Sequence, residues 1–438
     1  MRRFQFSWSI LVWCVAHINY VKGLEPVSHD KDCTIILSRK HLDDSAPLFL
    51  HYTPLTNSST QLFLPETRLE LSGRRINYLR VRNDESVLLA CPGQGNLVQG
   101  FDKAVTVMAC HDRKFSSQQS RIVVKELKCN DHMEVDVNKI GQCAQDDKFD
   151  YYKIGYKVLD KLNETLMEAC FDPVTLTTLY TRHSLRGGTL KSAVQKKHDR
   201  PFKNVDKLYG SVNPAILYNK KSQRKMFASY LDKSLFKKYL SANSLTRTQL
   251  VPRKDFPMKS WRRAVDIYVN LAPQWKSIAR GHWERMEINI RRVAMERNLT
   301  LDIITGILND DKSGNNATQS PLAKPDFLDP THRHIAIPDF FYKIVFDPVS
   351  KQGIVFVNDN NPLDFSGQKV CKDICSDNLW PSYKQTYAGV IYCCDVNEME
   401  SLLPGVPKVR VSGVLQGSNS LFQLGQDLLD ALDEIVQE

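Results

Sequence analysis

The distribution of cysteines constrains the fold of this chain more than any other feature of its sequence. Of 11 cysteines in 438 residues, Cys14 lies in an apolar amino-terminal segment and the others follow it. An even number of cysteines in an exported chain predicts disulfides, because secreted proteins fold in an oxidising compartment. The cysteines concerned are Cys33, Cys91, Cys110, Cys129, Cys143, Cys170, Cys371, Cys375, Cys393 and Cys394.

The amino terminus has the layout of a secretory signal peptide. Arg2 and Arg3 precede an apolar run over 6–18, and the small residue Gly23 follows. A short membrane anchor is the alternative, but the run is shorter than the roughly 20 residues a spanning helix needs. We therefore expect residues 1–23 to be cleaved and the mature chain to be secreted, extracellular and without a membrane span. Sequons that fit this compartment occur at Asn57, Asn163, Asn298 and Asn316.

A zinc site is the alternative to disulfides near the carboxyl end. Cys371 and Cys375, with the adjacent Cys393 and Cys394, offer four thiolates. Adjacent cysteines cannot easily present both sulfurs to one tetrahedral ion, and export favours oxidation. Disulfides are the favoured interpretation.

The hydrophobic pattern divides the chain into regions. Short alternating segments at 76–81, 86–89 and 121–127 predict that 24–150 is β-rich and tied by disulfides. A mixed domain is expected over 151–405, with a helix over 156–170, a strand over 176–183 and hairpin strands over 342–346 and 354–357. Residues 309–330 predict a surface loop, and leucines three or four apart predict an amphipathic helix within 406–438.

The net charge favours an anionic partner. The chain carries +10 at pH 7, and about +7 without Arg2, Arg3 and Lys22. Basic residues crowd 191–238, a surface that could follow phosphates, although charge runs are more often solvated surface. Candidate nucleic-acid contacts are Lys196, Lys197, Lys220, Lys221, Arg224 and Lys225.

Two segments carry the clearest motifs. Residues 244–256 read SLTRTQLVPRKDF, and residues 270–292 read NLAPQWKSIARGHWERMEINIRR. Together they closely resemble the DNA/RNA non-specific endonucleases, in particular the secreted insect double-stranded ribonuclease branch. That family has Asp/Ala-Arg-Gly-His-Leu-x-Pro, then Asn-x-x-Pro-Gln, then Asn-x-Gly-x-Trp-x-x-x-Glu-x-x-x-Arg. Segments 88–93, 179–183, 343–362 and 380–394 are similar to the same branch.

The resemblance implies an α+β fold with a ββα-metal nuclease core, a mixed or antiparallel sheet and flanking helices. It also implies a mechanism. A histidine takes a proton from water, one Mg²⁺ is held by an asparagine and waters, and a glutamate orients those waters. Arginines bind the phosphate as charge develops.

Four residues of this chain match the family's site. They are Arg247 beside the histidine position, Glu287 and Arg291 on the helix, and Arg182 on a strand. Glu287 and Arg291 are four residues apart and share a helix face. An ordinary helical salt bridge is the alternative for this pair.

The chain departs from the family at the two positions that carry the chemistry. Gln249 stands in place of the histidine, and an amide has no useful basicity near pH 7. Ala279 stands in place of the metal-binding asparagine. The sequence Arg280-Gly281-His282 spells the family's Arg-Gly-His, but it directly precedes Trp283 and is interpreted as a chance match. His282 is expected to face a phosphate at the helix start or to lie on the surface, and a role as substitute base is the alternative.

These departures predict a secreted nuclease-fold protein that binds RNA or DNA and has lost most or all phosphodiester hydrolysis. One alternative is an active Mg²⁺-dependent endonuclease with a rearranged site. The other is an extracellular interaction protein that reuses the scaffold for an unrelated partner.

Overall fold

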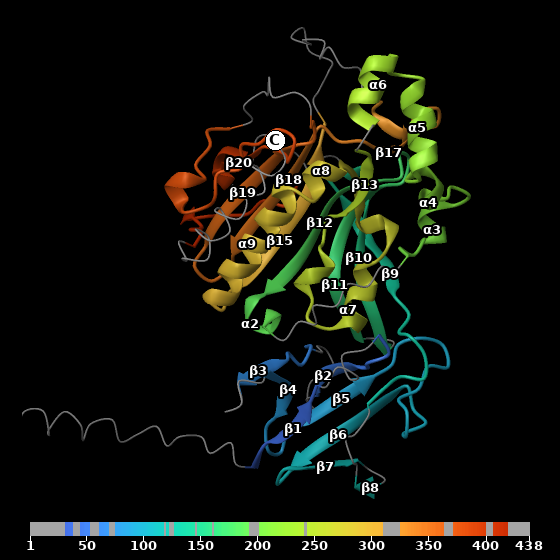
Figure 1. The fold of residues 1–438 in the computed structure, drawn as a ribbon. Coiled ribbons are helices and arrows are strands. Elements are labelled where there is room, and N and C mark those ends of the chain that lie inside the picture. The colour runs from blue at the N-terminus through green and yellow to red at the C-terminus, as the bar shows by residue number, and fades with distance from the viewer. Residues whose placement is uncertain are drawn as a thin grey trace, which may run out of the picture.

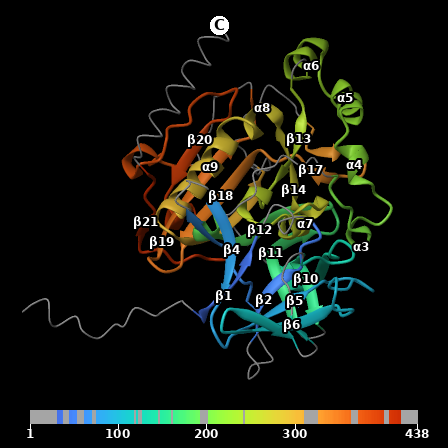
Figure 2. The same ribbon diagram turned by 60° about the horizontal axis from the view of Figure 1, so that its bottom comes forward.

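The fold is α+β, as the sequence predicts. The computed structural model describes residues 31–37, 44–52, 61–69, 75–117, 120–121, 127–144, 147–159, 162–191, 201–240, 243–309, 325–362, 371–399 and 406–418. Two small sheets lie at one end of the molecule, and helices α5 (Lys220–Ala228) and α6 (Lys233–Leu240) lie at the opposite end (Figures 1 and 2). A large sheet with its covering helices lies between them.

The amino-terminal sheets are antiparallel, with strand orders β1-β4-β3 and β2-β5-β6-β7-β8. A disulfide between Cys33 and Cys110 joins β1 to β6, so it ties the two sheets together. A second disulfide, Cys91–Cys129, closes the segment after β5. The strands are β1 (Cys33–Ile36), β2 (Leu48–Tyr52), β3 (Glu66–Leu69), β4 (Arg75–Val81), β5 (Ser86–Ala90), β6 (Val105–His111), β7 (Lys114–Ser117) and β8 (Ser120–Arg121).

The large sheet has nine strands in the order β20-β19-β18-β15-β12-β11-β10-β9, with β21 paired to β19. All pairs are antiparallel except β19 with β21, so the sheet is mixed, as expected. Its strands are β9 (Asp136–Cys143), β10 (Phe149–Leu159), β11 (Leu162–Asp172), β12 (Thr177–Arg186), β15 (Thr300–Leu308), β18 (Phe340–Asp347), β19 (Gln352–Asp359), β20 (Ile391–Cys394) and β21 (Gly413–Val414).

Several predictions about this sheet can be compared with its strands. The strand expected over 176–183 is β12, and the expected hairpin is formed by β18 and β19, so both predictions are confirmed. The predicted domain boundary at residue 150 falls within β10. The division into domains stays a prediction.

The helix expected over 156–170 is wrong, because these residues form parts of β10 and β11. Tyr152, Ile154, Tyr156 and Val158 are buried, whereas Lys153 and Lys157 are exposed. That alternation is the period of a strand. Leu, Lys, Glu and Met favour helix locally, but antiparallel pairing of β10 with both β9 and β11 outweighs this weak preference.

A long helix covers one face of the large sheet. Helix α9 (His282–Glu296) packs Trp283, Met286 and Ile290 against β12, β15 and β18, while Tyr180, Ile304 and Tyr342 lie in a separate cluster on the opposite face. The remaining helical segments are α2 (Gly187–Leu190), α3 (Asp206–Tyr209), α4 (Pro214–Leu217), η3 (Arg253–Asp255), α7 (Lys259–Val265), η4 (Tyr268–Asn270), α8 (Lys276–Ala279), η5 (Ser376–Asn378) and α10 (Val396–Met399).

The ten cysteines form disulfides, as predicted. Besides the two amino-terminal bonds, the pairs are Cys143–Cys170, Cys371–Cys394 and Cys375–Cys393. The last two pairs rule out the alternative four-thiolate zinc site, because disulfide sulfurs are no longer thiolates.

Other predictions lie wholly or partly outside the described residues. These concern the signal peptide, Asn57, Asn316, most of the 309–330 loop, Lys196, Lys197 and the carboxyl-terminal helix. The end of the predicted loop forms strand β16 (Phe327–Asp329). Asn163 lies in β11, and Asn298 is exposed just after α9. Within the described residues, no helix combines the length and apolar character needed to cross a membrane.

Candidate functional site

The motif segments form two antiparallel strands followed by a helix. Strand β13 (Leu245–Gln249) pairs with β14 (Leu271–Trp275), and short α8 then leads into α9. Buried amides attach this unit to its surroundings. Gln274 donates to Asn358 Oδ1 on β19 at 3.0 Å, and Asn270 donates to the carbonyls of Val251 and Val265 at 2.8 Å each. The ββα unit is therefore held in a fixed position against the large sheet.

The amide of Gln249 is engaged at both ends within the protein. Its Nε2 donates to the Val265 carbonyl and to Asp266 Oδ1, both at 3.1 Å. Its Oε1 accepts the backbone N–H of Arg253 at 3.3 Å. Gln249 thus connects the end of β13 to η3 and to the end of α7. A side chain in this position stabilises local structure and has no basic atom with which to accept a proton.

The predicted metal-ligand position, Ala279, and the predicted carboxylate, Glu287, lie on successive helices. Ala279 ends α8, and its side chain is a methyl group. Glu287 lies on α9, where Lys343 Nζ approaches its Oε1 to 3.4 Å. The ammonium also donates to Thr305 Oγ1 at 2.7 Å and to the Leu250 carbonyl at 3.4 Å. Lys343 is only 1% exposed, so Glu287 has a buried amine as its neighbour.

Burial shifts both groups of this pair toward their neutral forms. Removal from water raises the pKa of Glu287, against the opposing attraction of Lys343 and Arg291. It lowers the pKa of Lys343, against the attraction of Glu287 and Asp255. Lys343 also lies 5.4 Å from the centroid of the Trp283 ring, which further favours a cation there. The protonation of Glu287 and that of Lys343 therefore depend on each other.

Arg291 belongs to a second buried group. Its Nη1 donates to Asp255 Oδ1 at 2.9 Å, and His183 Nε2 lies 2.8 Å from the other oxygen, Oδ2. Burial alone would raise the pKa of Asp255, but the hydrogen bond from His183 and the charge of Arg291 lower it to about 2. The carboxylate is therefore ionised at neutral pH and holds the Arg291 guanidinium in place.

Arg182 does not join this group. It is the immediate neighbour of His183 on β12, and successive residues of a strand point to opposite faces. Arg182 instead forms a bidentate pair with Asp302 on β15, with Nε at 3.0 Å from both carboxylate oxygens. The structure therefore separates Arg182 from Arg291 and Glu287, which the sequence pattern had grouped together.

Arg247 lies on β13 and is exposed. Its positive charge acts to lower the pKa of the Tyr218 and Tyr268 phenols, against the larger rise that burial causes. Of the arginines assigned to the site from the sequence, Arg247 is the one that solvent reaches most freely.

His282 is buried in a structural position, so the expected surface position is wrong. It is 4% exposed, its Nδ1 lies 2.7 Å from the Gly389 carbonyl, and its backbone N–H donates to the Ala388 carbonyl at 2.9 Å. Its ring packs on Tyr383 with centroids 5.4 Å apart. These contacts dock the start of α9 and agree with the interpretation of Arg280-Gly281-His282 as a chance match.

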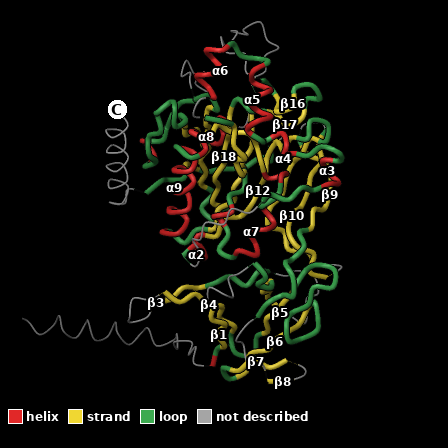
Figure 3. Tube along the Cα trace, turned by 45° about the vertical axis from the view of Figure 1, so that its right-hand side comes forward, coloured by secondary structure: helices red, strands yellow, loops and turns green. Residues whose placement is uncertain are grey.

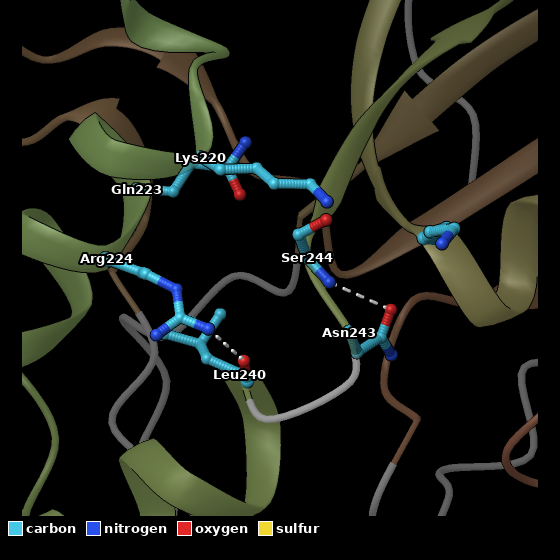
Figure 4. A pocket seen from close by; sticks show the side chains of 7 residues that line it. Lys220, Gln223, Arg224, Leu240, Asn243 and Ser244 are labelled. Atoms are coloured by element: carbon cyan, nitrogen blue, oxygen red, sulfur yellow. Dashed lines mark hydrogen bonds between the residues drawn. The ribbon is translucent and has the colours of Figure 1, made fainter.

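A polar pocket lies beside the amino end of β13. Lys220 extends from α5 toward Ser244, and Arg224 lies over Leu240, to whose carbonyl it donates at 3.0 Å (Figure 4). Gln223 fixes α5 to β13 through hydrogen bonds with both the N–H and the carbonyl of Leu245. The lining residues are Lys220, Gln223, Arg224, Leu240, Asn243, Ser244 and Lys276. Three cations thus surround one small polar cavity.

Sequence reasoning missed several residues of these groups. Asp255 lies within the first motif segment but carries no predicted role, and Lys343 begins one of the similar segments. A lysine within a strand of apolar residues is a signal, because buried lysines need a partner. His183 and Lys276 directly adjoin residues that were considered. Their partners come from distant segments, which the sequence could not reveal.

A protein-family comparison matches residues 147–399 to the family described as DNA/RNA non-specific endonuclease. The chain belongs to this family. The matched range contains the ββα unit, both buried groups and the polar pocket. Members of the family generally depend on Mg²⁺.

Similar proteins include several that are named as salivary proteins. A protein named salivary endonuclease from Lutzomyia longipalpis is 28% identical over 87% of this chain and 86% of its own length. Salivary protein Tsal2A from Glossina morsitans morsitans is 26% identical over 88% and 94%. Another salivary endonuclease, from Culex quinquefasciatus, is 22% identical over 79% and 90%.

Among solved structures, the crystal structure of the EndoG/EndoGI complex aligns with 47% of this chain and 76% of the matched chain. The sequence identity is 15% and the TM-score is 0.30. This similarity is too low to support a conclusion about the site.

Proposed function

We propose that this protein is a secreted member of the family that binds RNA or DNA and has lost, or nearly lost, phosphodiester hydrolysis. The observation that carries the proposal is the state of Gln249. Both ends of its amide are bonded within the protein, to Val265, Asp266 and Arg253. Loss of one member of a catalytic unit typically lowers turnover by orders of magnitude.

The metal position supports the same proposal. Mg²⁺ requires oxygen ligands in near-ideal octahedral geometry. The methyl group of Ala279 supplies none, and Glu287 has Lys343 as its nearest described cation. The residues present therefore do not fit a directly bound Mg²⁺, and the proposed function assigns no step to one.

Nucleic-acid binding is supported by the cations in and around the polar pocket. Lys220, Arg224 and Lys276 line one polar pocket, and Arg247 lies on the adjacent strand β13. Lys221 and Lys225 extend the same exposed side of α5. Cations spaced along a surface bind a phosphate backbone without reading its sequence. The names of two relatives, both called salivary endonucleases, agree with this class of ligand.

The leader, the disulfides and the sequons support secretion. Export through an oxidising compartment explains why all ten cysteines that follow the leader are paired. Amino-terminal sequencing of protein released from a eukaryotic host should find a start near residue 24. Retention of the leader would contradict this part of the proposal.

The decisive experiment is a nuclease assay with purified mature protein on double-stranded RNA and DNA, with Mg²⁺ and with EDTA. We expect no EDTA-sensitive cleavage by the natural chain. The double variant Gln249→His/Ala279→Asn should gain such cleavage, because it restores the base and the ligand together. Addition of Glu287→Ala to that variant should remove the gained activity.

Gln142→His is the matched control for the introduced histidine, since Gln142 is exposed on β9 far from the ββα unit in sequence. It should behave like the natural chain. Cleavage by the natural chain that requires Mg²⁺ and disappears in Glu287→Ala would overturn the proposal in favour of an active enzyme. Absence of RNA and DNA binding even at low salt would favour an unrelated partner instead.

A further inference from the structure

A hairpin outside the nuclease-like site brings two histidines to one aspartate. Strand β16 ends at Asp329, β17 (His334–Ala336) begins at His334, and these two residues are paired across the hairpin. The connecting residues 330–333 include His332. The hairpin lies beside α5 (Figures 1 and 3). None of the motifs or functions discussed above uses these three residues.

The potential ligand atoms converge closely. His332 Nδ1 lies 2.8 Å from Asp329 Oδ2, and His334 Nδ1 lies 3.7 Å from the same oxygen. One ligand atom from each of the three residues can be chosen so that all lie within 4.8 Å of one another. The two imidazole rings are stacked, with centroids 5.6 Å apart and planes 15° apart. Both rings therefore approach the carboxylate from one side.

The backbone of the turn favours this arrangement. Arg333, between the two histidines, has a φ of 58°, a conformation that a residue with a side chain rarely adopts. Its guanidinium lies over the Phe327 ring at 5.3 Å from the centroid. This contact anchors the turn to β16 and so fixes His332 relative to Asp329.

We propose that Asp329, His332 and His334 form a binding site for a divalent transition-metal ion, with Zn²⁺ as the ion that fits best. Zinc binds imidazole nitrogen and carboxylate oxygen at about 2.0–2.2 Å in a tetrahedron, which separates neighbouring ligand atoms by about 3.3 Å. The observed separations of 2.8 and 3.7 Å lie on either side of that value. Small side-chain rotations are sufficient to close the site.

The donor set also selects the class of metal. Two imidazoles and one carboxylate suit zinc, copper or nickel, whereas Mg²⁺ and Ca²⁺ prefer oxygen ligands. Three protein ligands leave the fourth tetrahedral position for water or another ligand. The His332 side chain is 67% exposed, so this position is open to solvent.

One nitrogen in the cluster lacks a hydrogen-bond partner within the described residues. His334 Nδ1 is buried and makes no hydrogen bond to any of them. A buried polar atom without a partner is unfavourable, and a metal ion would satisfy it. By contrast, a purely structural turn would need only the hydrogen bond between His332 and Asp329. The position of His334 is the feature that a structural turn leaves unexplained.

The test is a Zn²⁺ titration of untagged mature protein with its disulfides intact, after removal of metal with a chelator. A chromophoric competitor reports affinity, and Co²⁺ in place of Zn²⁺ reports the ligand geometry through its visible absorption. We expect one high-affinity equivalent that a large excess of Mg²⁺ does not displace. His332→Ala, His334→Ala and Asp329→Asn should each weaken binding by more than the roughly 10–100-fold cost of losing an outer-shell partner.

His111→Ala is the matched control, because His111 is an exposed imidazole beside two carboxylates, 3.0 Å from Asp84 and 3.5 Å from Asp112. It should leave Zn²⁺ affinity unchanged. Zn²⁺ should also raise the thermal unfolding temperature of the natural chain and of His111→Ala, but not of the three ligand variants. The proposal is wrong if the natural chain binds no Zn²⁺ at micromolar concentrations. It is equally wrong if the ligand variants bind Zn²⁺ as the natural chain does.

Discussion

The cations below α9 and the cations around α5 are the same residue types in opposite environments. Below α9, Arg291 is paired with Asp255 and Lys343 with Glu287, and all four side chains are almost fully removed from solvent. Around α5, Lys220, Arg224 and Lys276 line an open polar pocket. Among the described residues, these three form no ion pair. The cations below α9 are paired within the protein, whereas the cations around α5 can bind a ligand.

Burial therefore decides whether a basic residue of this chain acts in protein stability or in ligand binding. A buried pair is strongly destabilised when one partner is removed, because the other charge is left without compensation. An exposed cation contributes little to stability but exchanges its counterions readily for phosphate. Variants in the two regions should therefore affect different measurements.

The largest effect is expected for Asp255→Ala. It leaves His183 and the Arg291 guanidinium buried without their carboxylate, so the free energy of unfolding should fall by about 3–5 kcal/mol. Denaturant unfolding measures this change. Glu284→Ala breaks the exposed pair between Lys254 of η3 and Glu284 of α9 and should cost at most about 1 kcal/mol. Equal effects of the two variants would contradict the distinction between the regions.

A smaller effect is expected in the pH dependence of stability. The pKa of Asp255 is lowered in the folded state, so its ionised form stabilises the fold at neutral pH, and this contribution is lost as the pH falls toward 2. The natural chain should lose about 2 kcal/mol from this group between about pH 5 and pH 2. Asp255→Asn should lack that component, whereas Asp84→Asn on the exposed surface should retain it.

Gln249→Ala should lower the free energy of unfolding by less than Asp255→Ala does. It removes the hydrogen bonds to Val265, Asp266 and Arg253, and we expect a loss of about 1–2 kcal/mol in the free energy of unfolding. Gln142→Ala, on the exposed edge of β9, should change stability by less than about 0.5 kcal/mol. A neutral result for Gln249→Ala would show that its side chain is not held as described.

The smallest effect on stability is expected for the triple variant Lys220→Ala/Arg224→Ala/Lys276→Ala. Each change should alter the free energy of unfolding by less than about 0.5 kcal/mol. In binding to RNA or DNA, however, the slope of log affinity against log salt should decrease by about 0.9 for each phosphate that the variant no longer neutralises. Lys103→Ala/Lys114→Ala/Lys153→Ala removes equal charge from exposed positions elsewhere and should preserve the slope. Identical slopes would place the nucleic-acid surface outside this pocket.

Local patterns predicted those parts of the fold in which period and composition agree. The β-branched and aromatic residues at 177–186 and the run at 340–359 form the expected strands. The region at 156–170 failed because its leucines, lysines and glutamates favour helix locally, while its partners β9 and β12 are supplied by other segments. Pairing between distant strands is not written in local propensity.

In the candidate site too, local patterns predicted some relations between residues, and others depend on distant segments. Spacing alone placed Glu287 and Arg291 on one helix face, and the motif alone identified Gln249 and Ala279 as departures from the family. The sequence could not show that Arg182 faces away from His183 or that Lys343 reaches Glu287. These relations depend on which face of a sheet each strand presents.

By itself, then, the sequence determined the family, the α+β class and the presence of disulfides, and it predicted that Gln249 and Ala279 stand at the base and metal-ligand positions. Only the tertiary structure decided which cysteines pair, which cations are buried with partners, how the Gln249 amide is bonded and that Asp329 meets His332 and His334. The physical reason is that residue identity fixes what a side chain can do. Burial and contacts with distant segments fix whether it is free to do it.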